Sequence, residues 1–176
     1  MEIYFLRHAN AGEPKLNPAK DEKRTLDELG IDQSHIVGRG LAAMKVKVDE
    51  VISSPLARAA ETAAIVAEEI GHVDKIILDD LLRPQGTYSE FEQLLARHGD
   101  KEAIMVVGHN PSMTEFINRL VFGNDAEGIE LKKGAIAKVD REPDKLGVLK
   151  WSMPPKVMRA LQQASAKSSR PKTVSK

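Results

Sequence analysis

The sequence contains no cysteine, which excludes disulfides, thiol chemistry and metal sites built on thiolates. It also lacks an excess of charge of either sign, because 26 lysines and arginines balance 26 aspartates and glutamates. Proteins that bind duplex nucleic acid usually carry a large basic excess, so nucleic acid is not an expected partner. Cysteine-based enzymes are therefore excluded and a nucleic-acid-binding role is disfavoured.

Long apolar runs are missing as well. No stretch approaches the ~20 apolar residues that a membrane-spanning helix needs, so no membrane association is expected. The first residues, Met1–Tyr4, have neither the basic nor the apolar region of a secretory signal. A chain of 176 residues is long enough to bury a core as one domain. We expect a cytoplasmic, monomeric protein.

Short β-branched runs alternate with helical patterns along most of the chain. Strands are expected at Glu2–Leu6, Glu50–Ser53, Lys75–Leu78, Ala103–Val107, Ala135–Val139 and Val148–Trp151. This alternation predicts an α/β three-layer sandwich, with a mostly parallel central sheet and helices on both faces. The last two strands flank a turn-rich segment and predict a closing antiparallel hairpin.

Capping residues mark the expected helices. Asp27, Ser54 and Asn110 are expected N-caps, the last two followed by proline, and Ser89 with Glu92 has the spacing of a capping box. The expected helices cover about 27–44, 55–70, 89–98, 111–122 and 154–164, and 12–25 is expected to be a polar loop. The segment 165–176 is polar and basic and is predicted to be a disordered tail, so the domain spans 1–164.

Histidine and arginine side chains follow three of the expected strands. Arg7 and His8 end the first strand, Arg58 lies just after the second, and His109 follows the fourth. Ligands of open α/β sheets bind outside the carboxyl ends of the strands, so these side chains are expected to share one pocket. A single histidine at a strand end is more often solvated than catalytic, and only the coincidence at three strand ends favours a site.

This set of side chains suits a phosphoryl group. Arginine binds two phosphate oxygens at once, and helix N-termini add free N–H groups and partial positive charge. A neutral imidazole can attack phosphorus if its other nitrogen keeps its proton, usually held by a carbonyl. A second, protonated histidine can stabilise the charge on the equatorial oxygens. The residues alone do not decide which histidine, His8 or His109, is the nucleophile.

At these residues the chain resembles the histidine phosphatase superfamily, the phosphoglycerate-mutase-like group. The matching motifs are LRHA at 6–9, SSPLARAAETA at 53–63 and VVGHNPS at 106–112. The segments TLDELG at 25–30, GAIAKV at 134–139 and LKWSMPP at 149–155 are similar to its small branch, the SixA-type phosphohistidine phosphatases. The resemblance covers about residues 1–160.

The resemblance implies roles for particular residues. His8 would be the nucleophile that becomes phosphorylated, and Arg7, Arg58 and His109 would grip the phosphoryl oxygens. The implied reaction needs no metal and no cofactor, and a phosphate or sulfate ion would fit the pocket. Four further residues are predicted to bind substrate: Asn10, Arg24, Ser54 and Asn110. Asn10 stands where relatives often have Gly, Asp or Glu, and Lys133 where a threonine is common, so both positions bear on substrate preference.

One expected group is missing. Larger members of the family carry a glutamate general acid after the third strand, but here the segment 81–86 reads LLRPQG and has no carboxylate. A phosphate ester benefits from such an acid, whereas the nitrogen leaving group of phosphohistidine can arrive already protonated. We therefore predict a phosphatase of phosphohistidine on proteins, with a role in signal transduction. The alternatives are a phosphatase of small phosphate esters and a non-catalytic phosphate-binding module.

Overall fold

A computed structural model of the chain describes residues 1–123 and 128–168. The strands are β1 (Glu2–Arg7), β2 (Glu50–Ser53), β3 (Ile77–Leu78), β4 (Ala103–Gly108), β5 (Ile136–Asp140) and β6 (Val148–Met153). The helices are α1 (Pro18–Glu22), α2 (Glu28–Ala43), α3 (Ala57–Glu69), α4 (Tyr88–Arg97), α5 (Ser112–Phe122) and α6 (Pro155–Ser168), with a 3-10 turn η1 at Asp80–Leu82.

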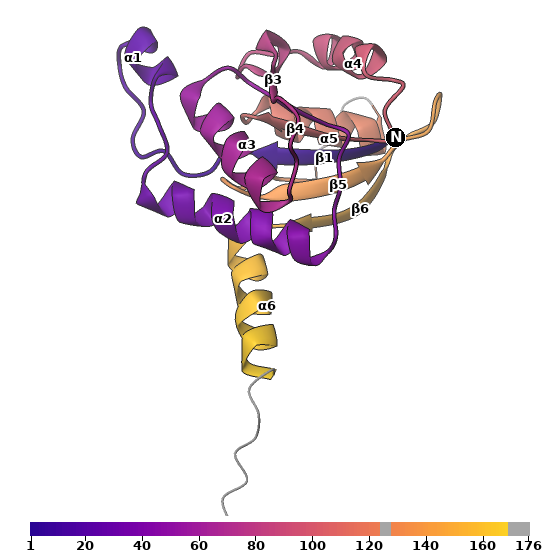
Figure 1. The fold of residues 1–176 in the computed structure, drawn as a ribbon. Helices are drawn as coiled ribbons and strands as arrows, with labels where there is room; N and C mark the ends of the chain where they lie inside the picture. Colours follow the sequence, from indigo (N-terminus) through magenta and orange to yellow (C-terminus); the bar gives the residue numbers. More distant parts are fainter. Residues whose placement is uncertain (124–127, 169–176) are drawn as a thin grey trace, which may run out of the picture.

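The six strands form one sheet in the order β3-β2-β4-β1-β5-β6. The first four strands in this order are parallel, whereas β5 runs antiparallel to both β1 and β6. The predicted three-layer α/β sandwich, with a mostly parallel sheet and a closing antiparallel hairpin, is therefore confirmed (Figure 1).

Strand β1 shows how the sheet separates two apolar layers. Successive side chains of a strand point to opposite faces, so Ile3 and Phe5 join one layer and Tyr4 and Leu6 the other. The first layer packs against α4 and α5, and the second against α2, α3 and α6. Burial on both faces explains why β1 and β4 read as nearly continuous apolar runs.

Two of the expected caps lie at other residues. The N-cap of α3 is Leu56 and that of α5 is Pro111, and neither helix has a side-chain cap. Ser54 N donates to Val107 O (2.9 Å) and continues the β2 pairing, and its hydroxyl accepts from Leu56 N (3.3 Å) and lies 2.9 Å from His109 Nε2. Asn110 donates its side-chain amide to Leu131 O (2.9 Å). Tertiary partners therefore use the side chains that the sequence pattern assigned to caps.

The capping box of α4 also differs from its expected position. It is formed by Thr87 and Glu90, two residues before the predicted pair Ser89 and Glu92. Thr87 Oγ1 accepts from Glu90 N, and Glu90 Oε2 accepts from Thr87 N. Both pairs have the required spacing, and the reciprocal bonds form only at the earlier one.

The ends of the chain add two corrections. The expected polar loop 12–25 contains α1, which begins after Asn17 as N-cap with Pro18 in its first turn. Helix α6 continues to Ser168, so residues 165–168 of the predicted disordered tail are helical. Alanine and lysine, which are strong helix formers, supply part of that extension. The rest of the predicted tail, 169–176, lies outside the described residues.

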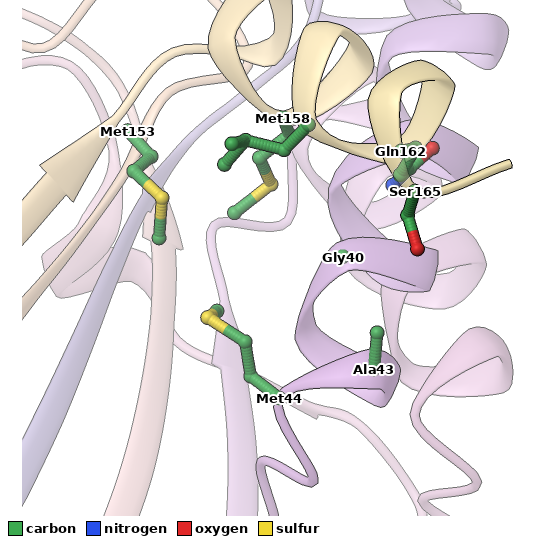
Figure 2. Close-up of a pocket in the computed structure, with 8 residues that line it drawn as sticks. Gly40, Ala43, Met44, Met153, Met158, Gln162 and Ser165 are labelled. Carbon is green, nitrogen blue, oxygen red and sulfur yellow. The ribbon is translucent and has the colours of Figure 1, made fainter. Parts of the chain in front are cut away.

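Helix α6 projects from the body of the molecule and contacts α2 near its start (Figure 1). A cavity of about 480 Å³ lies beside this contact, and three methionines, Met44, Met153 and Met158, line much of it (Figure 2). It contains none of the predicted site residues. No helix among the described residues is both long and apolar enough to cross a membrane.

Candidate active site

The carboxyl ends of β1, β2 and β4 meet at one edge of the sheet, as predicted. Arg7 pairs with Gly108, and Ser53 pairs with Val107. The next residue continues the contact, because His8 N donates to Gly108 O (2.9 Å). The backbone therefore brings the three predicted motifs together before any side chain is considered.

His8 is 7% exposed, and its ring orientation fixes its tautomer. Its Nδ1 lies 2.7 Å from the carbonyl oxygen of Ala9, which can only accept a hydrogen bond. Nδ1 therefore carries the proton, and Nε2 keeps its lone pair. The pKa of His8 is lowered to about 4, mainly by burial and also by the charges of Arg58, Arg7 and Lys133, while the hydrogen bond to Ala9 O opposes the shift. A neutral imidazole with a free Nε2 is the form that a nucleophile requires.

His109 lies beside His8, with the two ring centroids 4.9 Å apart. Its Nε2 is 2.9 Å from Ser54 Oγ, whereas its buried Nδ1 has no hydrogen-bond partner within the described residues. The pKa of His109 is lowered to about 2, mainly by burial and also by the neighbouring His8 and the arginines. The surroundings therefore favour neutral His109, and an anion would be needed to oppose the arginines and favour the predicted protonated form.

Arg7 and Arg58 approach this pair from different elements. Arg7 Nη1 donates to Leu131 O (2.8 Å), and Arg58 Nη1 donates to the backbone oxygen of Asp21 (3.0 Å). In both guanidinium groups the buried Nε finds no partner among the residues described. Buried donors usually have partners, so these N–H groups and His109 Nδ1 suit the oxygens of an incoming anion.

Arg24, one of the predicted substrate-binding residues, has hydrogen-bond partners within the protein. Arg24 Nε donates to Asp21 Oδ1 (2.8 Å), and its Nη1 donates to Ala11 O (2.9 Å). Its charge still acts on the site, because it contributes to the lowered pKa of His109. Arg24 is therefore held by partners within the protein, and its positive charge acts on His109 of the site.

Asp21, at the end of α1, is a residue that the sequence reasoning missed. Its Oδ2 lies 3.4 Å from Arg58 Nη1, and the hydrogen bond from Arg24 is the main reason why its pKa is lowered to about 2. The signal that could have located this helix is Asn17-Pro18, an N-cap followed by a first-turn proline. The surrounding run of lysines favoured a solvated loop instead.

The segment Leu131–Gly134 also lies beside the site, and its backbone contacts with the site residues were not predicted. Leu131 O accepts from both Arg7 and Asn110, and Gly134 N donates to the carbonyl oxygens of Arg7 and His8 (3.1 Å each). Lys133 lies between these anchors and donates to Asn10 Oδ1 (3.0 Å). Because main-chain carbonyls make these contacts, side-chain motifs could not have identified the segment.

The predicted site residues thus fall into two groups. His8, Arg58, His109 and Ser54 are buried close together, and the half-buried Arg7 acts on both histidines through its charge. Asn10, Arg24 and Asn110 lie around these residues and hold backbone or side-chain partners.

A family model described as the histidine phosphatase superfamily (branch 1) matches residues 3–85. Among curated proteins, an uncharacterised protein of the cyanobacterium Picosynechococcus is 29% identical over 88% of this chain and 100% of its own length. The phosphohistidine phosphatase SixA of Escherichia coli is 26% identical over 88% of this chain and 94% of its own.

Solved structures show the same likeness. The protein histidine phosphatase SixA in complex with tungstate has a TM-score of 0.76 and 25% identity, covering 90% of this chain and 99% of that one. A putative phosphohistidine phosphatase SixA from Agrobacterium tumefaciens has a TM-score of 0.74 at 24% identity, covering 88% and 97%. The latter shares the fold.

Proposed function

The chain belongs to the histidine phosphatase superfamily, and from this premise we propose that it removes phosphoryl groups from phosphohistidine in proteins. The observation that carries the proposal is the state of His8. Its Nδ1 proton is held by the Ala9 carbonyl, so Nε2 is free to attack phosphorus beside two arginines. The likeness to this family supports His8 as the nucleophile and Arg7, Arg58 and His109 as the residues that bind the phosphoryl oxygens.

The proposed reaction has two steps. His8 Nε2 forms a bond to phosphorus while the bond from phosphorus to the substrate nitrogen breaks. That nitrogen keeps the electron pair of the broken bond, and because the other ring nitrogen of the substrate already carries a proton, the substrate leaves as neutral imidazole. Water then attacks the phosphorylated His8, and inorganic phosphate leaves with the imidazole restored. In both steps the guanidinium groups of Arg7 and Arg58 stabilise the negative charge on the equatorial oxygens.

The proposed preference for a nitrogen leaving group rests on the lack, among the described residues of the site, of a carboxylic acid that could protonate an oxygen leaving group. No carboxylate hydrogen-bonds His8 or His109 in the described part of the chain. Asp21 is near Arg58, but its lowered pKa keeps it ionised and therefore unable to donate a proton at neutral pH. At the place where a glutamate acid was expected, Arg83 forms ion pairs with Asp80 and Glu22. A P–N bond needs such an acid less than a P–O bond does.

One observation favours the alternative of small phosphate esters. The Asp21 backbone and side chain contact Arg58, so α1 partly encloses the pocket. Rates on a phosphohistidine protein and on small phosphate esters would separate the two substrate classes. Faster turnover of the esters would favour the alternative.

The test of the proposed nucleophile is His8→Ala. We expect this variant to lose turnover of a phosphohistidine protein, because it removes the imidazole that is proposed to carry the phosphoryl group. With labelled substrate, wild-type protein should carry label on His8 after an alkaline quench, which preserves P–N bonds. The readouts are phosphate release and the labelled protein, and circular dichroism checks the fold.

His35→Ala is the matched control, because His35 is a partly exposed histidine of α2 that pairs with Glu69 outside the site. It should retain wild-type turnover. Full activity of His8→Ala would refute the proposed nucleophile. Binding of phosphoprotein with neither turnover nor label in the wild type would instead support a non-catalytic binding module.

A further inference from the structure

Lys133 is an exposed cation whose position is fixed by the backbone beneath it. The next residue, Gly134, donates its N–H to the carbonyl oxygens of Arg7 and His8. Gly134 has φ +69°, and a Cβ there would lie 2.9 Å from Pro155 Cγ, so the turn depends on glycine. The base of Lys133 is therefore attached directly to the strand end that carries the proposed nucleophile.

The Lys133 ammonium is also held at its tip. Its Nζ donates to Asn10 Oδ1 (3.0 Å), while Asn10 Nδ2 donates to Asp27 Oδ2 (2.6 Å). Only this orientation of the amide satisfies both neighbours, because an ammonium can only donate and a carboxylate can only accept. Asp27 thus fixes the orientation of the Asn10 side-chain amide, and the amide oxygen fixes the position of the Lys133 ammonium.

Asn10 itself is rigidly placed. Its backbone N donates to Gln33 Oε1 (2.9 Å), and its backbone O accepts from Asp27 N (3.3 Å). A Cβ on Gly30 would lie only 1.9 Å from Asn10 O, which shows how closely α2 packs on this residue. The start of α2 therefore supports a chain of contacts that ends in one exposed positive charge.

That charge acts on His8. Lys133 is among the groups whose charge lowers the pKa of His8, alongside Arg58 and Arg7. Arg58 is buried and Arg7 is half-buried, whereas Lys133 is exposed. A phosphoryl group inside the pocket would already be matched by the arginines, so the lysine is placed for an anion that stays outside.

We propose that Lys133, held by Asn10 and Asp27, is a specificity-determining residue that binds a carboxylate next to the phosphorylated residue of the substrate. The proposal rests on the proposed function, since it presumes that a phosphorylated side chain enters the pocket beside His8. The ammonium has three N–H donors and gives one of them to Asn10, so it can also donate to a carboxylate. An exposed ion pair of this kind changes affinity by about two- to fivefold, and salt screens it.

The experiment compares two phosphohistidine peptides that differ only in an aspartate or an asparagine beside the phosphohistidine. Their binding to the full-length His8→Ala protein is measured by calorimetry at low ionic strength, so that no turnover intervenes. The aspartate peptide should bind about two- to fivefold more tightly. Adding Lys133→Gln should abolish this difference, whereas Lys133→Arg should retain most of it.

Lys132→Gln is the control, because it removes the same charge from the exposed neighbouring residue, which makes no side-chain hydrogen bond in the described structure. It should leave the difference between the peptides intact. Equal binding of both peptides, or a difference that survives Lys133→Gln, would overturn the inference alone. So would equal weakening of both peptides by Lys133→Gln, which would place the lysine on the phosphoryl group.

Wild-type turnover of the asparagine peptide tests the proposed function separately. Turnover together with equal binding of the two peptides would support the proposed phosphatase activity and contradict the proposed role of Lys133. Absence of both turnover and binding would overturn the inference together with the proposed substrate class.

Discussion

At the scale of single residues, the two histidines of the site are buried beside arginines, and both effects disfavour an imidazolium. The pKa of His8 is lowered to about 4 and that of His109 to about 2. In an unfolded chain both would have a pKa near 6.5. The unfolded state therefore binds more protons than the folded state below about pH 6.5.

This difference predicts how stability depends on pH. The free energy of unfolding should fall as the pH is lowered from about 6.5 to 5, by up to about 1.4 kcal/mol per pH unit for each histidine. Urea denaturation across this range measures the slope. His109→Gln removes one titrating group and should reduce the slope, whatever it does to stability at neutral pH.

The carboxylates do not produce the same effect in that range. The lowered pKa of Asp21 contributes stability that is lost only as the pH falls through its unfolded value near 3.9 toward 2. Identical slopes for wild type and His109→Gln between about pH 6.5 and 5 would contradict the assignment of a neutral, buried His109.

At the scale of elements, helix α2 positions the rim of the site through its first turn. Asp27 caps the helix by accepting from Gly30 N (2.8 Å), and its other carboxylate oxygen holds the Asn10 amide. Helix and site share this residue, so a change that displaces the first turn of α2 also displaces Asn10. The close approach of Gly30 to the Asn10 backbone makes the coupling testable.

Gly30→Ala should destabilise the protein by about 1–3 kcal/mol, because its Cβ would meet the Asn10 carbonyl, which cannot rotate away. The loss should outweigh the gain of up to about 1 kcal/mol in helix propensity. Urea denaturation measures it.

Gly40→Ala is the matched control in the same helix. There the nearest atom to the new Cβ is the sulfur of Met158, at 2.8 Å on a flexible side chain that can move. We expect little loss of stability, or a gain. Equal destabilisation by the two variants would show that the contact between Gly30 and the Asn10 carbonyl does not account for the loss of stability.

For the whole molecule, two apolar layers hold the sheet so that three strand ends face one pocket. On one face, Phe91 and Phe116 stack with centroids 4.5 Å apart, and Phe5 of β1 contacts the same cluster. Phe116 belongs to α5, the helix that begins just after His109. The packing of this layer therefore fixes the element that follows the site.

Phe116→Ala should lower the free energy of unfolding by about 3–5 kcal/mol, the usual loss for a fully buried aromatic side chain. Phe122→Ala, in the same helix but with its side chain 50% exposed, should cost much less. Chemical denaturation of both variants gives the comparison. A small loss for Phe116→Ala would mean that the layer can collapse around the cavity.

Much of the fold was predictable because local patterns and burial agree. Helix α2 has the cap at Asp27 and the extent that its sequence indicated, and β4 is the apolar strand expected near 103–107. The capping residues were less reliable. Ser54 and Asn110 have side chains that suit caps, but neither is the N-cap of its helix, and both contact partners distant in sequence, His109 and Leu131 O.

The sequence by itself determined the α/β class and the mostly parallel sheet, and it predicted that the side chains of Arg7, His8, Arg58 and His109 would lie together. Hydrophobic runs, turn residues and short motifs are local, so they can be recognised without coordinates. Only the tertiary structure decided the tautomer of His8, the pairing of Asp21 with the arginines, and the place of Lys133 over Asn10. Each of these depends on a carbonyl, a carboxylate or an amide brought close by the fold, and such contacts leave no local pattern in the sequence.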